Sequence, residues 1–130
     1  MIVLDTQAWL WWTSAPERLS PPARAAIDHA EEIGVASISA WEIARLVARD
    51  RIALDRSPAR WVRAALTTDP RTIELPLTSA IAVRAAQLGA DGMHGDPADR
   101  FVYATARSHD ALLVTRDAAL RAHDPERTVW

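Results

Sequence analysis

The sequence contains no cysteine, and this absence removes several kinds of chemistry at once. Disulfide bonds, thiolate zinc sites and a cysteine nucleophile are all excluded. Lysine is absent too, so all 15 basic residues are arginine. The 4 histidines show no paired ligand spacing such as HExxH, which disfavours a zinc site. Any catalytic chemistry in this chain therefore depends on its carboxylates.

Long apolar runs are also missing, since no stretch approaches the length that spans a bilayer. Met1 is followed directly by Ile2, with no basic region before the first apolar run. We therefore expect a cytoplasmic protein with no membrane partner. With 130 residues, of which 49% are hydrophobic and 25% charged, the chain is long enough for one packed domain. We expect residues 1–130 to form that single domain.

The charge balance gives a mixed indication about nucleic acids. A net charge of -2 weighs against a dedicated nucleic-acid binder, because the surface of such proteins is usually basic. Arginines nevertheless gather between positions 45 and 63. This segment is either a solvated helical face with ion pairs along the helix or a surface that follows phosphates.

Short apolar runs alternate with helix signals along the chain. We predict strands at 2–4, 35–38, 72–75, 111–114 and 128–130, and helices at 6–13, 20–32, 39–49, 57–66, 78–89 and 96–109. Gly34 is expected to end the second helix, and Ser39 to cap the third in a capping box with Glu42. Strands separated by helices predict an α/β fold with a mainly parallel sheet and helices on both faces.

Four carboxylates stand at the ends of predicted elements. Asp5 directly follows a predicted strand, Asp117 lies three residues after the end of another, and Glu42 lies in the first helical turn after a third. Because ligands bind beyond the carboxyl ends of parallel strands, these three acids should meet at one edge of the sheet. Asp99 begins the helix that leads into the strand before Asp117, so its arrival there is less constrained.

Acids gathered at the edge of a core need a cation, because an unpaired buried carboxylate is costly. Oxygen ligands from several elements suit Mg²⁺ or Mn²⁺, which keep some waters for substrate phosphates. The metal would activate water to attack a phosphodiester bond, without a protein nucleophile. The four acids therefore predict a metal-dependent phosphodiesterase.

Each acid also has a purely structural explanation. Asp5 and Asp117 can cap a helix or start a turn, and Glu42 can serve only the capping box. Asp96 before Pro97 is most economically an N-cap, with Asp99 at a position that the helix dipole favours. Only their joint placement favours a metal site over four separate caps.

Four segments together resemble the motifs of PIN domains, and more narrowly those of VapC-type toxins of type II toxin-antitoxin systems. These are IVLDT at 2–6, SAWEIA at 39–44, HGDPADR at 94–100 leading into ATA at 104–106, and LVTRD at 113–117. They span the whole chain in the same order as in the family. Their combination is far more specific than any one of them.

The resemblance implies a PIN-like α/β/α sandwich and a homodimer that cleaves RNA with Mg²⁺ or Mn²⁺ and is bound by an antitoxin protein. The metal and catalytic positions would be those of the four acids named above. Thr6 and Thr115 match hydroxyl positions that orient carboxylates or water, and Asp96 belongs to a motif variant with a supporting role. Arg116 would contact phosphate or screen the acids.

Two other functions stay open on the sequence alone. One is a catalytically silent PIN-like binding or regulatory module, whose acids serve only as caps. The other is a metal-dependent nuclease or phosphohydrolase that acts on another phosphate ester. A covalent phosphatase would use Asp5 as its nucleophile within a DxD pattern. It is disfavoured, because position 7, where the second aspartate of that pattern would stand, is Gln7.

Tryptophans crowd the first predicted helix. Trp9 and Trp12 are three residues apart and share a helical face, whereas Trp11 points elsewhere. We therefore expect one face to pack in the core and the other to meet a partner, rather than stacking on RNA bases.

Overall fold

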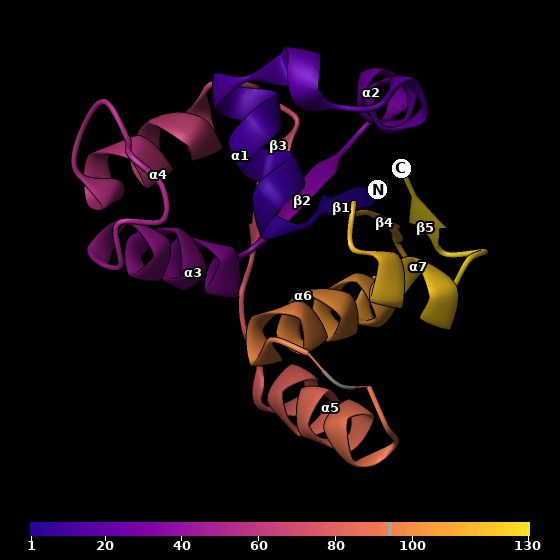
Figure 1. Cartoon of the computed structure of the whole chain (residues 1–130). Coiled ribbons are helices and arrows are strands. Elements are labelled where there is room, and N and C mark those ends of the chain that lie inside the picture. The colour runs from indigo at the N-terminus through magenta and orange to yellow at the C-terminus, as the bar shows by residue number, and fades with distance from the viewer. Residues whose placement is uncertain (94) are drawn as a thin grey trace.

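The centre of the fold is a sheet of five parallel strands (Figure 1). The computed structural model describes residues 1–93 and 95–130. The strand order is β3-β2-β1-β4-β5, which places β1 in the middle. The strands are β1 (Ile2–Leu4), β2 (Ile33–Ala36), β3 (Thr72–Leu75), β4 (Leu112–Val114) and β5 (Thr128–Val129). The predicted parallel α/β architecture is confirmed.

Helices connect the strands and cover the sheet on both sides (Figure 1). They are α1 (Thr6–Ser14), the short 3-10 helix η1 (Pro16–Arg18), α2 (Pro21–His29), α3 (Ser37–Ala48), α4 (Pro58–Thr67), α5 (Ser79–Ala90), α6 (Pro97–Ser108) and α7 (Ala118–His123). The sheet and its two helical layers form the predicted α/β/α sandwich.

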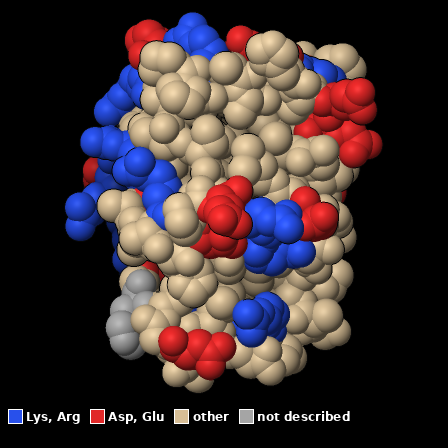
Figure 2. Space-filling view, turned by 90° about the vertical axis from the view of Figure 1, so that its right-hand side faces the viewer, with Lys and Arg blue, Asp and Glu red and all other residues tan. Residues whose placement is uncertain are grey.

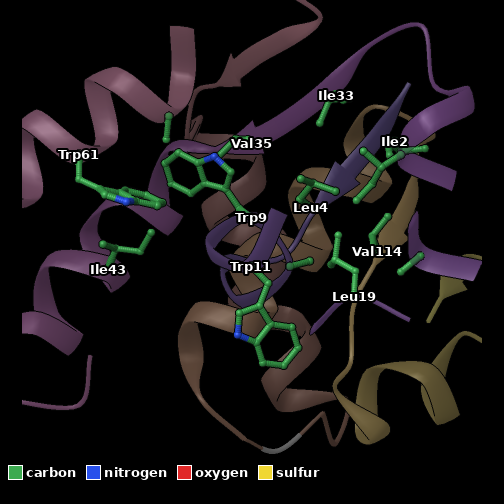
Figure 3. Packing of buried hydrophobic residues seen from close by; sticks show 14 residues of the cluster. Ile2, Leu4, Trp9, Trp11, Leu19, Ile33, Val35, Ile43, Trp61 and Val114 are labelled. Atoms are coloured by element: carbon green, nitrogen blue, oxygen red, sulfur yellow. The ribbon is translucent and has the colours of Figure 1, made fainter. Parts of the chain in front are cut away.

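Two hydrophobic cores lie on opposite faces of the sheet. Ile2 and Leu4 of β1 face the first core, which contains side chains from α1 to α4. Val3, between them, faces the second core with α5, α6 and α7. In the first core, the rings of Trp9 and Trp61 meet edge to face with centroids 5.1 Å apart (Figure 3). The apolar alternation in β1 thus fixes which helices lie on which side.

Helix starts agree with their sequence signals at three Ser-Pro or Asp-Pro pairs. Ser20, Ser57 and Asp96 each accept a hydrogen bond from a backbone N–H in the first turn of the following helix. Proline occupies the next position, where its missing N–H costs nothing. These local signals place α2, α4 and α6 correctly.

The prediction that Gly34 ends the second helix is wrong. Helix α2 already ends at His29, and Gly34 is buried inside β2. A Cβ on Gly34 would meet Leu75 Cδ1 at 2.6 Å and Val3 Cγ2 at 3.2 Å. The glycine is therefore required by close packing beside β1 and β3, and β2 starts two residues earlier than predicted.

The prediction that Ser39 caps the third helix is also wrong. That helix begins at Ser37, with Ala36 at the cap position and no side-chain cap. Ser39 lies within the helix and is fully buried. The capping box with Glu42 is therefore absent. The sequence analysis also missed η1 and α7, which are too short to show apolar periodicity.

In the described ranges 1–93 and 95–130, no helix has both the length and the apolar character needed to cross a membrane. Figure 2 shows acidic and basic side chains side by side on one face, with several basic ones along its left margin and others near its centre. This mixed surface accords with the small net charge of -2.

The packing around Gly34 gives the first prediction. Gly34→Ala should lower the free energy of unfolding by about 1–3 kcal/mol, because the new methyl group overlaps neighbouring strands. Gly89→Ala in α5 is the matched control, since its Cβ meets only the flexible end of Arg100. It should leave stability within about 1 kcal/mol of wild type. Urea unfolding measures both, and equal effects would contradict this role for Gly34.

Candidate active site

Four carboxylates reach one pocket from four separate elements. Asp5 follows β1 and Asp117 follows β4, whereas Glu42 comes from α3 and Asp99 from the first turn of α6. All four line a pocket of about 480 Å³ beyond the carboxyl ends of the strands. The structure therefore brings together every acid that the sequence analysis proposed for the metal site.

Two of these acids also cap helices. Asp5 Oδ1 accepts the N–H of Ala8 at 2.6 Å, and Asp117 Oδ1 accepts the N–H of Leu120 at 2.8 Å. The positive end of each helix therefore faces a carboxylate of the pocket. The caps hold the two carboxylates in fixed orientations at the ends of their strands.

Buried hydroxyl groups orient the acids further. Thr6 Oγ1 donates to Glu42 Oε2 at 2.5 Å and lies 3.0 Å from Ser39 Oγ. The N–H of Asp117 donates to Thr115 Oγ1 at 3.0 Å. The Thr115 side chain also hydrogen-bonds the carboxylate of Asp5. The burial of Ser39 is thus explained by a contact within the site.

The pocket holds its acids in unfavourable surroundings for negative charge. Desolvation raises the pKa of Asp5 from 3.8 to about 6, although hydrogen bonds from Thr115 and Ala8 oppose the rise. Desolvation, then the charges of Glu42, Asp117, Asp5 and Asp96, raise the pKa of Asp99 to about 7. Burial also raises the pKa of Glu42. The four acids therefore interact as one electrostatic cluster.

Asp96 occupies a different position. Its Oδ1 accepts the N–H of Ala98 at 3.0 Å, and its Oδ2 lies 3.3 Å from Arg45 Nη1. It does not line the acidic pocket. Its charge nevertheless contributes to the raised pKa of Glu42. His94, which begins the HGDPADR motif, lies outside the described residues.

Apolar side chains that the sequence analysis missed form one wall of the pocket. Leu10, Leu46 and Ile52 line it beside the acids. Leu10 lies four residues after Thr6, and Leu46 lies four residues after Glu42, so each shares a helical face with a polar site residue. That four-residue spacing could have identified Leu10 and Leu46 as pocket residues from the sequence. Ile52 lies in the loop after α3, where no periodicity applies.

The donors in the pocket suit a hard divalent cation. Among residues 1–93 and 95–130, no three histidine or acidic side chains lie close enough together to ligate one ion simultaneously. Mg²⁺ needs no such cage, because it is commonly bound through one or two carboxylates and retains several waters. Carboxylates whose pKa is raised by burial and by neighbouring acids gain from a cation beside them. The residues present therefore fit such a metal.

Comparison with known proteins identifies close relatives of this chain. The sequence profile of the PIN domain matches residues 2–124. Over 131 aligned positions the chain is 41% identical to Ribonuclease VapC22 of Mycobacterium tuberculosis, with 99% of this chain and 98% of that protein covered.

Solved structures share the fold at low sequence identity. A toxin-antitoxin complex from Klebsiella pneumoniae matches with a TM-score of 0.70 at 19% identity, covering 100% of this chain and 97% of that one. VapBC2 from Rickettsia felis, bound to a promoter DNA fragment, matches with a TM-score of 0.67 at 14% identity, covering 99% and 98%. The family profile and the 41% identity carry the assignment: this chain belongs to the PIN-domain family.

Proposed function

We propose that the chain is a metal-dependent endoribonuclease, the toxin of a type II toxin-antitoxin system, acting as a single PIN-like domain over residues 1–130. The observation that carries this proposal is the pocket in which Asp5, Glu42, Asp99 and Asp117 meet. The name of the 41% identical relative, a ribonuclease, supports RNA as the substrate. A cytoplasmic location stays a prediction.

The pocket formed by the four acids would hold Mg²⁺ or Mn²⁺, through one or two carboxylates directly and through retained waters at the others. The catalytic roles proposed for the acids follow from that binding. When bound, such an ion lowers the pKa of a water and neutralises charge on phosphoryl oxygens. The Thr6 side chain holds the carboxylate of Glu42 in place, and the Thr115 side chain holds that of Asp5. Leu10, Leu46 and Ile52 limit the access of bulk water on one side, which strengthens electrostatic interactions in the pocket.

The antitoxin and homodimer proposals have separate support. The toxin-antitoxin complexes that share this fold support an antitoxin partner. The homodimer proposal is supported by large apolar side chains that are exposed on α3, on α5 and in the segment just before α5. Trp41 is 53% exposed, Leu77 39% and Val83 58%. The N–H of Leu77 donates to Ser37 Oγ, one helical turn before Trp41, so two of these side chains leave the same region of the surface.

A catalytically silent binding module is the second candidate. It is favoured by one observation, that Asp5 and Asp117 have complete structural roles as helix caps. Titration with Mn²⁺ separates the two functions. A nuclease binds the ion saturably and loses binding in Asp5→Asn, whereas a module whose acids are only caps does neither.

Asp99 offers the sharpest test of the catalytic proposal, because no hydrogen bond of its carboxylate holds α6 in place among the described contacts. Asp99→Asn should lower Mn²⁺-dependent RNA cleavage by roughly two orders of magnitude or more, in the range seen when one transition-state contact is removed. Asp5→Asn should do the same, since asparagine keeps the N-cap. Both variants should stay folded by circular dichroism. Cleavage at the wild-type rate would refute the assignment.

A prediction for Asp96 separates its capping role from metal binding. Asp96→Ser should keep the cap of α6 and most of the activity, whereas Asp96→Ala should cost about 1 kcal/mol of stability. Chemical unfolding and cleavage assays on the two variants measure these effects. If Asp96→Ser loses Mn²⁺ binding completely, Asp96 ligates the metal directly and its supporting role is wrong.

The raised pKa values predict how stability depends on pH without metal. Asp5 and Asp99 bind protons more tightly in the folded chain, so their stabilising effect is complete below about pH 4 and is lost as pH rises through 6 to 7. Relative to wild type, Asp99→Asn should therefore gain about 1 kcal/mol between pH 5 and pH 8, after discounting for solvent screening. Thermal melts across this range measure the difference. A difference that is constant with pH would contradict the shifted pKa.

A further inference from the structure

Two arginines lie against the ring of one buried tryptophan beside the acidic pocket. Arg18 Cζ is 4.6 Å from the centroid of the Trp11 ring, and Arg116 Cζ is 5.6 Å from it. Trp11 is only 4% exposed, and its ring contacts that of Trp130 at 5.6 Å. Figure 3 shows Trp11 pointing away from Trp9, toward a different part of the molecule. The buried tryptophan ring is therefore a rigid surface against which two exposed guanidinium groups are held.

Neither arginine is neutralised by an acid. Within residues 1–93 and 95–130, no carboxylate oxygen lies within 4.0 Å of a guanidinium nitrogen of Arg18 or Arg116. This is notable for Arg116, because it follows Thr115, precedes Asp117 and lines the pocket that holds all four acids. A flexible arginine beside four carboxylates would ordinarily pair with one of them.

The tryptophan ring explains why Arg116 stays out of such a pair. A cation held against an indole face gains about 0.5–2 kcal/mol, which is comparable to a partly exposed ion pair. Because Arg116 is held there, the carboxylates keep their charge available for a metal. Its N–H groups also stay available for an anion, and a guanidinium suits phosphate oxygens particularly well.

A second hollow adjoins the acidic pocket. It has a volume of about 770 Å³, is lined by both Trp11 and Arg18, and shares Leu10 and Ile52 with the acidic pocket. Arg116 thus lines the acidic pocket, and Arg18 lines the neighbouring hollow. The two guanidinium carbons are no farther apart than the sum of their distances from the ring.

We propose that Trp11 is a positioning residue that holds Arg18 and Arg116 as a pair of phosphate-binding groups for the RNA strand next to the cleaved bond. This inference rests on the proposed ribonuclease function. The strand passes from the acidic pocket over Trp11 into the larger hollow, and each arginine contacts one backbone phosphate. An otherwise acidic site thereby gains local attraction for a polyanion.

The arginines between positions 45 and 63 offer a competing path. Two of them are already paired, Arg45 with Asp96 and Arg56 with Asp55. Arg49, Arg60 and Arg63 are exposed. These three do not line the acidic pocket or the adjoining hollow, whereas Arg51 and Arg56 of the same segment line the hollow. Their contribution is measured in the same experiment.

The test is binding of a fluorescein-labelled single-stranded RNA of mixed sequence, measured by anisotropy at several salt concentrations. The full chain carrying Asp99→Asn is used with Mn²⁺, so that the RNA stays intact. Arg18→Gln and Arg116→Gln should each weaken binding and reduce the log-log salt slope by about 0.7, the value for one lost phosphate contact with a single strand. Arg84→Gln, which removes an exposed arginine on α5 that lines neither hollow, is the control and should change neither quantity.

Further variants isolate the role of the tryptophan. Trp11→Phe keeps a weaker aromatic face and should give intermediate binding, whereas Trp11→Leu should bind as weakly as the double arginine variant. Added to that double variant, Trp11→Phe should cause no further loss, because no cation remains for the ring to hold. Melting temperatures verify folding, and if Trp11→Leu does not fold, Trp11→Phe decides the outcome.

Two results would overturn the inference while leaving the ribonuclease function intact. In one, wild type cleaves the RNA but Arg18→Gln and Arg116→Gln bind with unchanged affinity and salt slope. In the other, Trp11→Phe weakens binding equally with and without the two arginines. The combined variant Arg49→Gln, Arg60→Gln and Arg63→Gln tests the competing path. If the salt slope falls in this variant and not in the Arg18 and Arg116 variants, the RNA lies on the competing path. Absence of cleavage by wild type counts against the proposed function itself.

Discussion

The burial of neighbouring acids at one edge of the sheet, and the repulsion among them, is the constraint on which the site depends. Asp5 and Asp99 each have a pKa raised by burial and by neighbouring carboxylates. Such a cluster lowers stability at neutral pH unless a cation offsets it. Helix N-termini offset part of the cost at Asp5 and Asp117, and the Thr6 hydroxyl does so at Glu42. The remaining repulsion provides a driving force for binding a metal.

The same constraint explains why structural and catalytic roles coincide. An acid just after a parallel strand lies at the sheet edge and at the start of the next helix. Asp5 directly follows β1, and Asp117 lies three residues after β4. Capping fixes the direction of each carboxylate without neutralising its charge. An ionised carboxylate has two acceptor oxygens, so one can accept the N–H of the helix cap while the other faces a metal. Capping is therefore compatible with the proposed chemistry rather than an alternative to it.

Local signals in the sequence predicted much of the fold and of the site. Short apolar runs located β1 and β4, and with them Asp5 and Asp117, because each acid follows its strand within three residues. The Asp96-Pro97 pair located α6 and therefore Asp99. These features depend on neighbours within a few residues, which sequence patterns record well.

Features that depend on distant contacts were missed. Ser39 contacts Thr6, 33 residues away, and this contact rather than capping accounts for its burial. Gly34 is required by side chains of β1 and β3. The ring of Trp11 meets arginines from η1 and from the loop after β4, so no spacing rule indicates the group. In each case the controlling neighbour is set by the tertiary fold.

Proton release on metal binding tests the central claim most directly. If Mn²⁺ binds among carboxylates whose pKa values are about 6 and 7, binding must displace the protons they carry. Calorimetric titration in buffers of different ionisation enthalpy should show release of about one proton at pH 6 and very little at pH 8. Saturable binding with the same proton release at both pH values, or no saturable binding, would contradict the account.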